Sequence, residues 1–124
     1  MEKELLNSGK ELLLQDLCAR LPYGVKYSCD DIKNVWRLKT IFTRSDNSIF
    51  CDGCNALESC KPYLFPLSSM TGMHRAELFN IRIPIEDPFQ DTLCEIDFYH
   101  RNHFDYRGLI PKGLAIDATG LNIY

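Results

Sequence analysis

The strongest constraint on the fold is a change of hydrophobic period at Pro22. Before it, apolar residues recur at the spacing of one helix face: Leu13, Leu14, Leu17, Cys18 and Leu21. Ser8 with Glu11 three residues later forms a capping-box pattern, so we expect a helix over residues 8–21 with this face in the core. After Pro22 the period shortens to two, which is typical of strands. The chain should therefore combine helices with a sheet.

Residues 25–52 predict a three-stranded antiparallel meander. VKYSC and NVWRLKTIFTR alternate apolar and polar residues, with the polar loop DDIK between them, and SIFC follows the turn signal SDNS. From Lys61 onward, prolines at positions 62 and 66 favour an extended edge or a loop over a central strand. The chain should cross the sheet at this point.

Two further helices are expected in the C-terminal half. Thr71 can cap a helix to about Asn80, although Gly72 lowers its helix propensity. Asp87, Pro88 and Gln90 form a start signal for a helix over about residues 88–102. Its inward stripe would contain Phe89, Leu93, Ile96 and His100, widened by Cys94 and Phe98. The remaining residues predict turns and short extended pieces.

These elements predict an α+β fold in a single domain, residues 1–124. A small antiparallel sheet, of about three strands, would be covered by the N-terminal and C-terminal helices. The chain has 124 residues, of which 45% are hydrophobic and 25% charged, enough for one ordinary core. It has no apolar run near the ~18 residues of a membrane span and no secretory signal pattern, so we expect a cytoplasmic protein that does not enter membranes.

The cysteines raise the question of a metal site. Cys51 and Cys54 have the two-residue gap of a zinc knuckle, with Gly53 between them. The second pair of ligands is not evident, because Cys60 follows at an irregular distance and His100 with His103 form a helical pair. A redox role for Cys51 and Cys54 would need a following helix, for which the sequence gives little support. We therefore expect free thiols and no cofactor, with zinc binding as an alternative.

A polar cluster near the C-terminus is the candidate site for chemistry. His100, His103, Asp105, Tyr106 and Arg107 lie within eight positions, and a histidine beside a carboxylate can transfer protons. No nucleophile elbow or phosphate-binding glycine loop accompanies them. We therefore expect a protein that is not an enzyme, in which His103 and Asp105 hold a turn after the helix.

Nucleic-acid binding is a further alternative. Residues 20–44 contain a basic strip interleaved with aromatic side chains, as in single-strand binders: Arg20, Lys26, Arg37, Lys39 and Arg44, with Tyr27, Trp36 and Phe42. Solvent-exposed faces of sheets show the same alternation without binding anything. The net charge of −3 also argues against a strong affinity for nucleic acid that is independent of sequence.

Three segments resemble recurring blocks of one protein family. ELLLQDLCARLPYGV at 11–25, KPYLFPLSSMT at 61–71 and NHFDYRGLIPKGLA at 102–115 are similar to blocks of small uncharacterised proteins from gut bacteria of the Bacteroides group and from their phages and mobile elements. The blocks cover about a third of the chain and keep their order. No catalytic role can be carried over from the resemblance, because that family has no established activity.

The blocks carry more polar and aromatic side chains than a core requires, which is the composition of interface anchors. The candidate binding residues are Tyr23, Tyr63, His103, Asp105, Tyr106 and Arg107. We expect a non-enzymatic module that binds a host or phage macromolecule, with a protein partner favoured over nucleic acid. By analogy with other small phage proteins, a counter-defence inhibitor of the anti-CRISPR kind is one concrete form. The sequence does not fix the oligomeric state.

Overall fold

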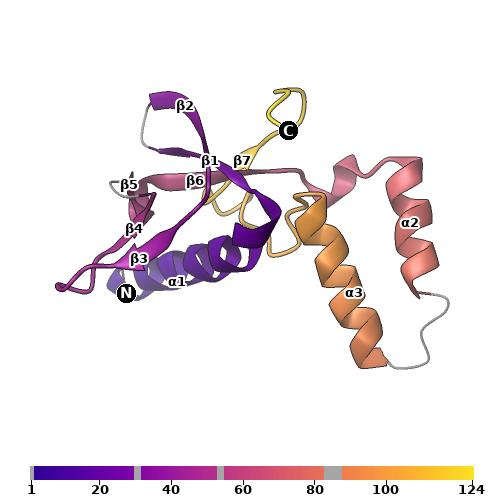
Figure 1. The fold of residues 1–124 in the computed structure, drawn as a ribbon, viewed down its shortest axis with the longest axis horizontal. Coiled ribbons are helices and arrows are strands. Elements are labelled where there is room, and N and C mark those ends of the chain that lie inside the picture. Colours follow the sequence, from indigo (N-terminus) through magenta and orange to yellow (C-terminus); the bar gives the residue numbers. More distant parts are fainter. Residues whose placement is uncertain (1, 30–31, 53–54, 83–87) are drawn as a thin grey trace.

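The structure, a computed structural model, describes residues 2–29, 32–52, 55–82 and 88–124. Within them, three α-helices accompany two small sheets, which confirms the α+β class. The two sheets and the first helix form the body of the molecule, and the other two helices project from it as a hairpin (Figure 1). No helix in this part of the chain has the length and apolar content needed to cross a membrane.

The N-terminal helix α1 extends from Glu2 to Arg20 and packs beneath the sheets (Figure 1). It begins earlier than expected, so Ser8 lies inside the helix and is not its N-cap. The helix ends in the 3-10 turn Leu21–Tyr23, which Gly24 closes in the left-handed conformation at φ 70°. Leu13 and Leu17 are buried as predicted, but Cys18 is exposed, so its expected place in the core is wrong.

The first sheet has the strand order β2-β1-β6-β7, with β1 at Lys26–Cys29, β2 at Ile32–Arg37, β6 at Cys60–Leu64 and β7 at Ile116–Asp117. Its neighbours pair antiparallel except for β6 and β7, which are parallel. The second sheet is antiparallel, in the order β3-β4-β5. Its strands span Ile41–Thr43, Ile49–Cys51 and Asn55–Ala56.

The predicted three-stranded meander is wrong, because residues 34–44 do not form one strand. They divide between β2 of the first sheet and β3 of the second. The corner between the sheets is held by Asp52, whose Oδ1 accepts the backbone N–H groups of Lys39 at 2.9 Å and Thr40 at 3.0 Å. Its Oδ2 accepts the Tyr27 hydroxyl at 2.7 Å. A carboxylate eight or more residues away in sequence thus interrupts a continuous β pattern.

The edge position predicted for the proline-containing segment is also wrong. Strand β6 lies between β1 and β7, with Pro62 opposite Tyr27. The proline is tolerated because β7 pairs only with Tyr63 and Leu64, so β6 has a neighbour on one side at Pro62. The 3-10 turn Leu57–Ser59 leads into this strand, and a second one, Leu67–Ser69, follows it.

Helices α2, Gly72–Arg82, and α3, Pro88–Arg101, form the hairpin. Thr71 caps α2 as predicted: its Oγ1 accepts the His74 N–H at 3.2 Å, and His74 Nδ1 accepts the Thr71 N–H at 3.1 Å. Asp87, the predicted cap of α3, lies outside the described residues. Phe98 and His100 are buried as expected, but Leu93 is 47% exposed, so its place in the predicted stripe is wrong. The side chain of Phe89 lies outside the described part of the chain.

The buried apolar residues form two clusters. The body core joins α1 to both sheets through Leu17, Val25 and Tyr27, and it includes Cys29, Cys51 and Cys60. The hairpin core contains Leu78, Phe98 and Phe104. An isolated parallel bridge between Phe65 and Phe104 connects the end of the first sheet to the segment after α3.

Candidate functional site

Three of the six predicted binding residues meet around His100, at the end of α3. The Tyr106 hydroxyl lies 2.7 Å from His100 Nε2, and the Tyr23 ring centroid lies 5.5 Å from that of His100. Arg107 Nε donates to the Tyr106 hydroxyl at 3.2 Å. The Tyr23 hydroxyl donates to Asp97 on α3. We call Tyr23, His100, Tyr106 and Arg107 the tyrosine–arginine cluster.

Beneath this cluster lies a buried ion pair that the sequence reading missed. Asp16 and Arg20 are both fully buried, and Arg20 Nε donates to Asp16 Oδ2 at 2.8 Å. Arg20 Nη2 donates to the Phe104 carbonyl at 2.5 Å, and Arg107 Nε lies 3.3 Å from Asp16 Oδ1. The sequence does contain a signal for this ion pair, because Asp16 and Arg20 are four positions apart and such positions are neighbours on a helix.

The charges of this pair are only partly compensated. Arg20 Nη1 and Asp16 Oδ1 have no hydrogen-bond partner, so the contact between Asp16 Oδ1 and Arg107 is ionic only. Burial raises the pKa of Asp16, and the guanidinium groups of Arg20 and Arg107 oppose that rise. The pair thus places a buried carboxylate beneath Arg107, to which it is joined by an ionic contact.

Two other predicted residues hold the fold. Tyr63 is 7% exposed in β6 and takes no part in the molecular surface around Tyr106. The Asp105 carboxylate accepts the backbone N–H groups of Leu109 at 2.8 Å and Ile110 at 2.9 Å, which is a turn-forming arrangement. Asp105 is therefore engaged by the backbone and is not paired with a histidine.

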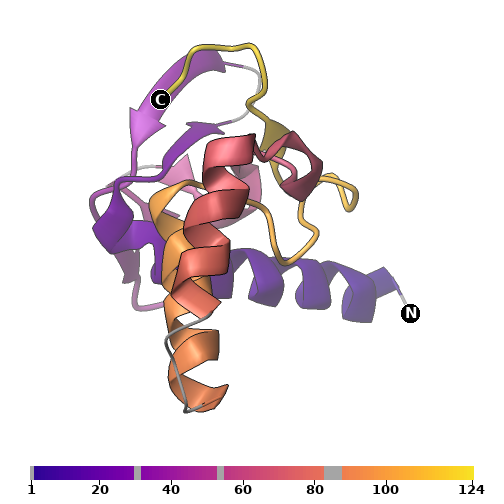
Figure 2. The same cartoon turned by 90° about the vertical axis from the view of Figure 1, so that its right-hand side faces the viewer.

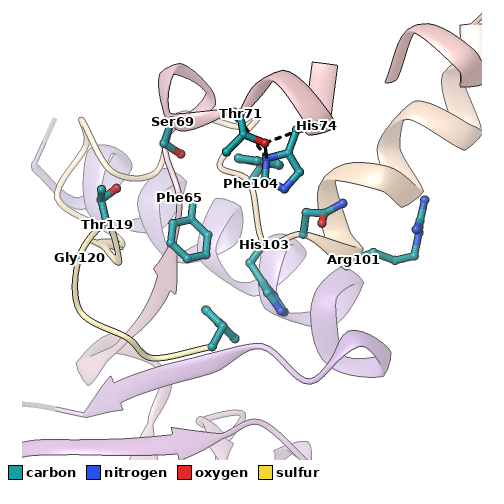
Figure 3. Close-up of a pocket in the computed structure, with 11 residues that line it drawn as sticks. Phe65, Ser69, Thr71, His74, Arg101, His103, Phe104, Thr119 and Gly120 are labelled. Carbon is teal, nitrogen blue, oxygen red and sulfur yellow. Dashed lines mark hydrogen bonds between the residues drawn. The ribbon is translucent and has the colours of Figure 1, made fainter. Parts of the chain in front are cut away.

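His103, the sixth predicted residue, lines a pocket of about 490 Å³ between the start of α2, the end of α3 and the C-terminal tail (Figure 3). Its ring stacks on Tyr124 with centroids 3.7 Å apart and planes 12° apart. Burial, with Arg20 and Lys26 nearby, lowers the pKa of His103 to about 4, so the ring is neutral at pH 7. Its Nδ1 is buried and has no hydrogen-bond partner.

The pocket does not assemble a nucleophile and base. Ser69 also lines it, but the Ser69 hydroxyl donates to the Pro66 carbonyl at 2.7 Å. Figure 3 shows Ser69 and His103 well apart, with Phe65 between them. The Thr71 hydroxyl is engaged with His74, and Asn102 Nδ2 donates to the Phe98 carbonyl at 3.0 Å. The side chains of Ser69, Thr71 and Asn102 therefore form hydrogen bonds with residues three or four positions away in the chain.

The residues considered for zinc do not come together in the described part of the chain. Cys51 is buried in β4, whereas His100 bonds to Tyr106 and His103 stacks on Tyr124. Cys54 lies outside the described residues. Among the residues that the structure does describe, no group of three or more His, Cys, Asp or Glu side chains is arranged to hold a metal ion.

The basic strip proposed for residues 20–44 is divided among the core and the two sheets. Arg20 and Tyr27 are fully buried, which removes one cation and one ring from any binding face. Lys26 lies opposite Arg37 in the first sheet. Arg44, after β3 of the second sheet, places its guanidinium carbon 3.8 Å from the Phe50 ring centroid. Trp36 and Phe42 are exposed, at 38% and 36%, but on different sheets.

The outward side of α2 carries a different, apolar surface. Met73 is 85% exposed and Phe79 is 60% exposed, with the exposed Ala76 midway between them. Positions three apart lie on one side of a helix, and Leu78 on the other side packs into the hairpin core. Figures 1 and 2 show α3 between α2 and the body, so this side of α2 faces away from the rest of the chain. We call Met73, Ala76 and Phe79 the hairpin face.

The hairpin also contains the charge excess of the protein. Residues 72–101 include six acidic residues and three basic residues, a difference of −3 that equals the net charge of the whole chain. The acidic ones are Glu77, Glu86, Asp87, Asp91, Glu95 and Asp97, and the basic ones are Arg75, Arg82 and Arg101. The remainder of the chain is electrically balanced.

Comparison of the chain with protein-family models, with curated proteins and with solved structures finds no match in any of the three.

Proposed function

We propose that the chain is a non-enzymatic binding module that docks its hairpin face on another protein, whose contact surface is apolar at its centre and basic at its rim. The observation that carries this proposal is the exposure of Met73 and Phe79 on a helix side that no other described element covers. Complete burial of such side chains contributes about 1.5–3 kcal/mol each. Large apolar residues on the outside of a helix mark interaction sites in many proteins.

The charge of the hairpin supports a basic protein as the partner. The acidic excess of the hairpin segment attracts a basic surface, speeds the encounter and repels other acidic surfaces. Nucleic acid and a second copy of the same chain would both present like charge to the hairpin. Both are therefore disfavoured as occupants of this face.

The resemblance of the three sequence blocks supports a host or phage protein as the partner. A counter-defence inhibitor, directed for example at a CRISPR effector, is the concrete form of the proposal, since nucleic-acid-processing effectors present basic surfaces. The tyrosine–arginine cluster would add a second contact on the α3 side, because Tyr23 and Asp97 join it to that helix. Aromatic and arginine side chains are common anchors at such interfaces.

The test compares capture by matched variants. Tagged wild-type protein, the double variant Met73→Ser/Phe79→Ser and the control Leu121→Ser would be incubated with host lysate treated with nuclease, and captured proteins identified by mass spectrometry. Leu121 is 49% exposed on the C-terminal tail and serves as an equally apolar control outside the hairpin. We expect one basic protein to be retained by wild type and Leu121→Ser and lost from the double variant, with thermal stability unchanged.

Three results would contradict the proposal. Capture that is equal for wild type and the double variant would place the binding surface elsewhere. A wild-type dimer in sedimentation that the double variant converts to a monomer would assign the hairpin face to a second copy. Binding that disappears on nuclease treatment would favour the nucleic-acid alternative.

A further inference from the structure

Three cysteines from both sheets meet in the body core. Cys29 lies in β1, Cys51 in β4 and Cys60 in β6, with exposures of 7%, 0% and 1%. All three belong to the same buried cluster, and all are free thiols. The three residues belong to three different strands, so the fold brings them together, and they lie outside the hairpin.

Cys29 and Cys60 are direct partners in the antiparallel pairing of β1 with β6. Opposite residues in such a pair have side chains on the same face and Cα atoms about 4.5–5.5 Å apart. This separation falls within the range of about 4.4–6.8 Å that disulfides span. The two sulfurs can therefore be joined without moving either strand far.

Cys60 also interacts with Cys51 across the two sheets. The Cys60 thiol hydrogen-bonds with that of Cys51, and its Sγ lies 3.3 Å from the Ala56 carbonyl oxygen. Cys60 additionally interacts with the Cys29 thiol, so it is the shared neighbour of the other two. We call Cys29, Cys51 and Cys60 the thiol cluster.

The three thiols differ in electrostatic surroundings. The hydrogen bond from Cys60 favours the thiolate of Cys51 and lowers the pKa of Cys51, although burial opposes this effect. The same bond and burial raise the pKa of Cys60. The thiolate is the nucleophile of cysteine chemistry, so the hydrogen bond from Cys60 favours Cys51 as the attacking thiol. Cys60, the neighbour of both other thiols, is placed to resolve.

We propose that the thiol cluster is a covalent oxidation site whose co-substrate is a hydroperoxide, and that Cys60 forms the resulting disulfide with Cys51 or Cys29. The Cys51 thiolate attacks the peroxide, forming a sulfenic acid and releasing the other oxygen as water after it takes a proton. Cys60 sulfur then attacks the sulfenic sulfur, and its proton leaves with the hydroxyl as a second water. Two thiols and one hydrogen peroxide thus give one disulfide and two waters.

Exchange then distributes the disulfide between two positions. The Cys29 thiolate attacks the Cys60 sulfur of the first disulfide, which forms a Cys29–Cys60 bond and releases Cys51 as a thiolate. The Cys51–Cys60 bond joins the second sheet to the first, whereas the Cys29–Cys60 bond joins β1 to β6 within one sheet. Oxidation therefore adds a covalent cross-link to the body core.

The experiment isolates the cluster in the full chain. The triple variant Cys18→Ser/Cys54→Ser/Cys94→Ser keeps only Cys29, Cys51 and Cys60. Treated with hydrogen peroxide in native buffer, it should lose two of its three titratable thiols and about 2 Da of mass, the two hydrogens removed on disulfide formation. Digestion without reductant should give a Cys60 peptide linked to the Cys51 or Cys29 peptide, and dithiothreitol should restore all three thiols.

A fourth substitution distinguishes this route from unspecific oxidation. Cys60→Ala in the same background leaves Cys29 and Cys51 without their shared partner, and we expect no intramolecular disulfide. Equal disulfide yield with and without Cys60 would overturn the proposal. So would three free thiols in the triple variant under conditions that oxidise a small dithiol, or cross-links between chains only. Peptide mapping of the triple variant decides the matter even where the Cys60→Ala chain does not fold.

Discussion

At the scale of single residues, the Asp16–Arg20 pair forms one of the connections between the body and the hairpin. Arg20 reaches from α1 to the Phe104 carbonyl, and Phe104 belongs to the hairpin core. A fully buried arginine therefore connects the body to the hairpin. Two buried charges must be desolvated, so their attraction stabilises the fold only while both partners are present.

This pairing gives the first prediction. Arg20→Met should lower the free energy of unfolding by about 3–5 kcal/mol, because it leaves the Asp16 carboxylate buried without its main partner. Asp16→Leu should have a similar cost, and the double variant should lose much less than the sum of the two. Urea denaturation of the four proteins measures this coupling. Strict additivity would mean that the pair contributes no interaction.

The second prediction concerns pH and His100. Burial, together with Arg20 and Arg107, lowers the pKa of His100 to about 4, below its ordinary value near 6.5. The unfolded chain therefore takes up the proton first, and the stability due to the neutral ring is present above pH 6.5 and lost as the pH falls toward 4. That loss should reach about 3 kcal/mol.

Chemical denaturation of wild type and His100→Gln between pH 7 and pH 4 checks this expectation. The carboxylates titrate in both proteins, so the difference between their pH slopes isolates His100. The variant should show the shallower slope. Identical slopes would show that His100 titrates normally in the folded protein.

At the scale of elements, α2 depends on a reciprocal cap in which histidine replaces the usual acidic residue. Thr71 and His74 bond to each other's backbone N–H groups. Thr71→Ala should therefore destabilise the protein by about 1 kcal/mol, whereas Thr71→Ser, which keeps the hydroxyl, should cost only a few tenths. His74→Ala combined with Thr71→Ala should cost less than the sum, as thermal unfolding would show. Equal destabilisation by Thr71→Ala and Thr71→Ser would show that the Thr71 hydroxyl does not stabilise the start of α2.

The elements that were predictable from sequence are those with local signals. The capped start of α2, the extent of α3 from Pro88 and the leucine face of α1 follow from residues within one or two turns. The break between β2 and β3 does not, because Asp52 causes it from a distant position. The central place of β6 also depends on where β7 stops pairing, which no local pattern records.

The candidate site was predictable in part for the same reason. Tyr23, Tyr106 and Arg107 do come together, as expected of an anchor surface, but the burial of Tyr63 depends on its strand having neighbours on both sides. The hairpin face had no distinguishing pattern, because Met73 and Phe79 are apolar like core residues. Only the structure shows that both side chains are exposed to solvent, on a helix that lies outside α3.

At the scale of the whole molecule, the two apolar cores suggest two cooperative units. The body core joins α1 to both sheets, whereas the hairpin core is built from fewer buried side chains. The units are connected through Phe104, by its bridge to Phe65 and by the Arg20 hydrogen bond, and through Tyr23, which bonds to Asp97 and packs on His100. These contacts involve α3 and the segment after it, so α2 can open while the body remains folded.

Native-state hydrogen exchange tests this last prediction. The amides of α2 should exchange through an opening at least about 2 kcal/mol below global unfolding, whereas those of β1 and the centre of α1 should exchange only with the whole protein. Leu78→Ala, which removes a buried side chain of the hairpin core, should speed exchange in α2 and α3. The difference between the free energy of hairpin opening and that of global unfolding should then be larger than in wild type. Leu17→Ala, in the body core, should instead lower the protection of β1 and α1. If both variants changed exchange equally in all elements, the chain would unfold as one unit, and the hairpin could not adapt to a partner independently of the body.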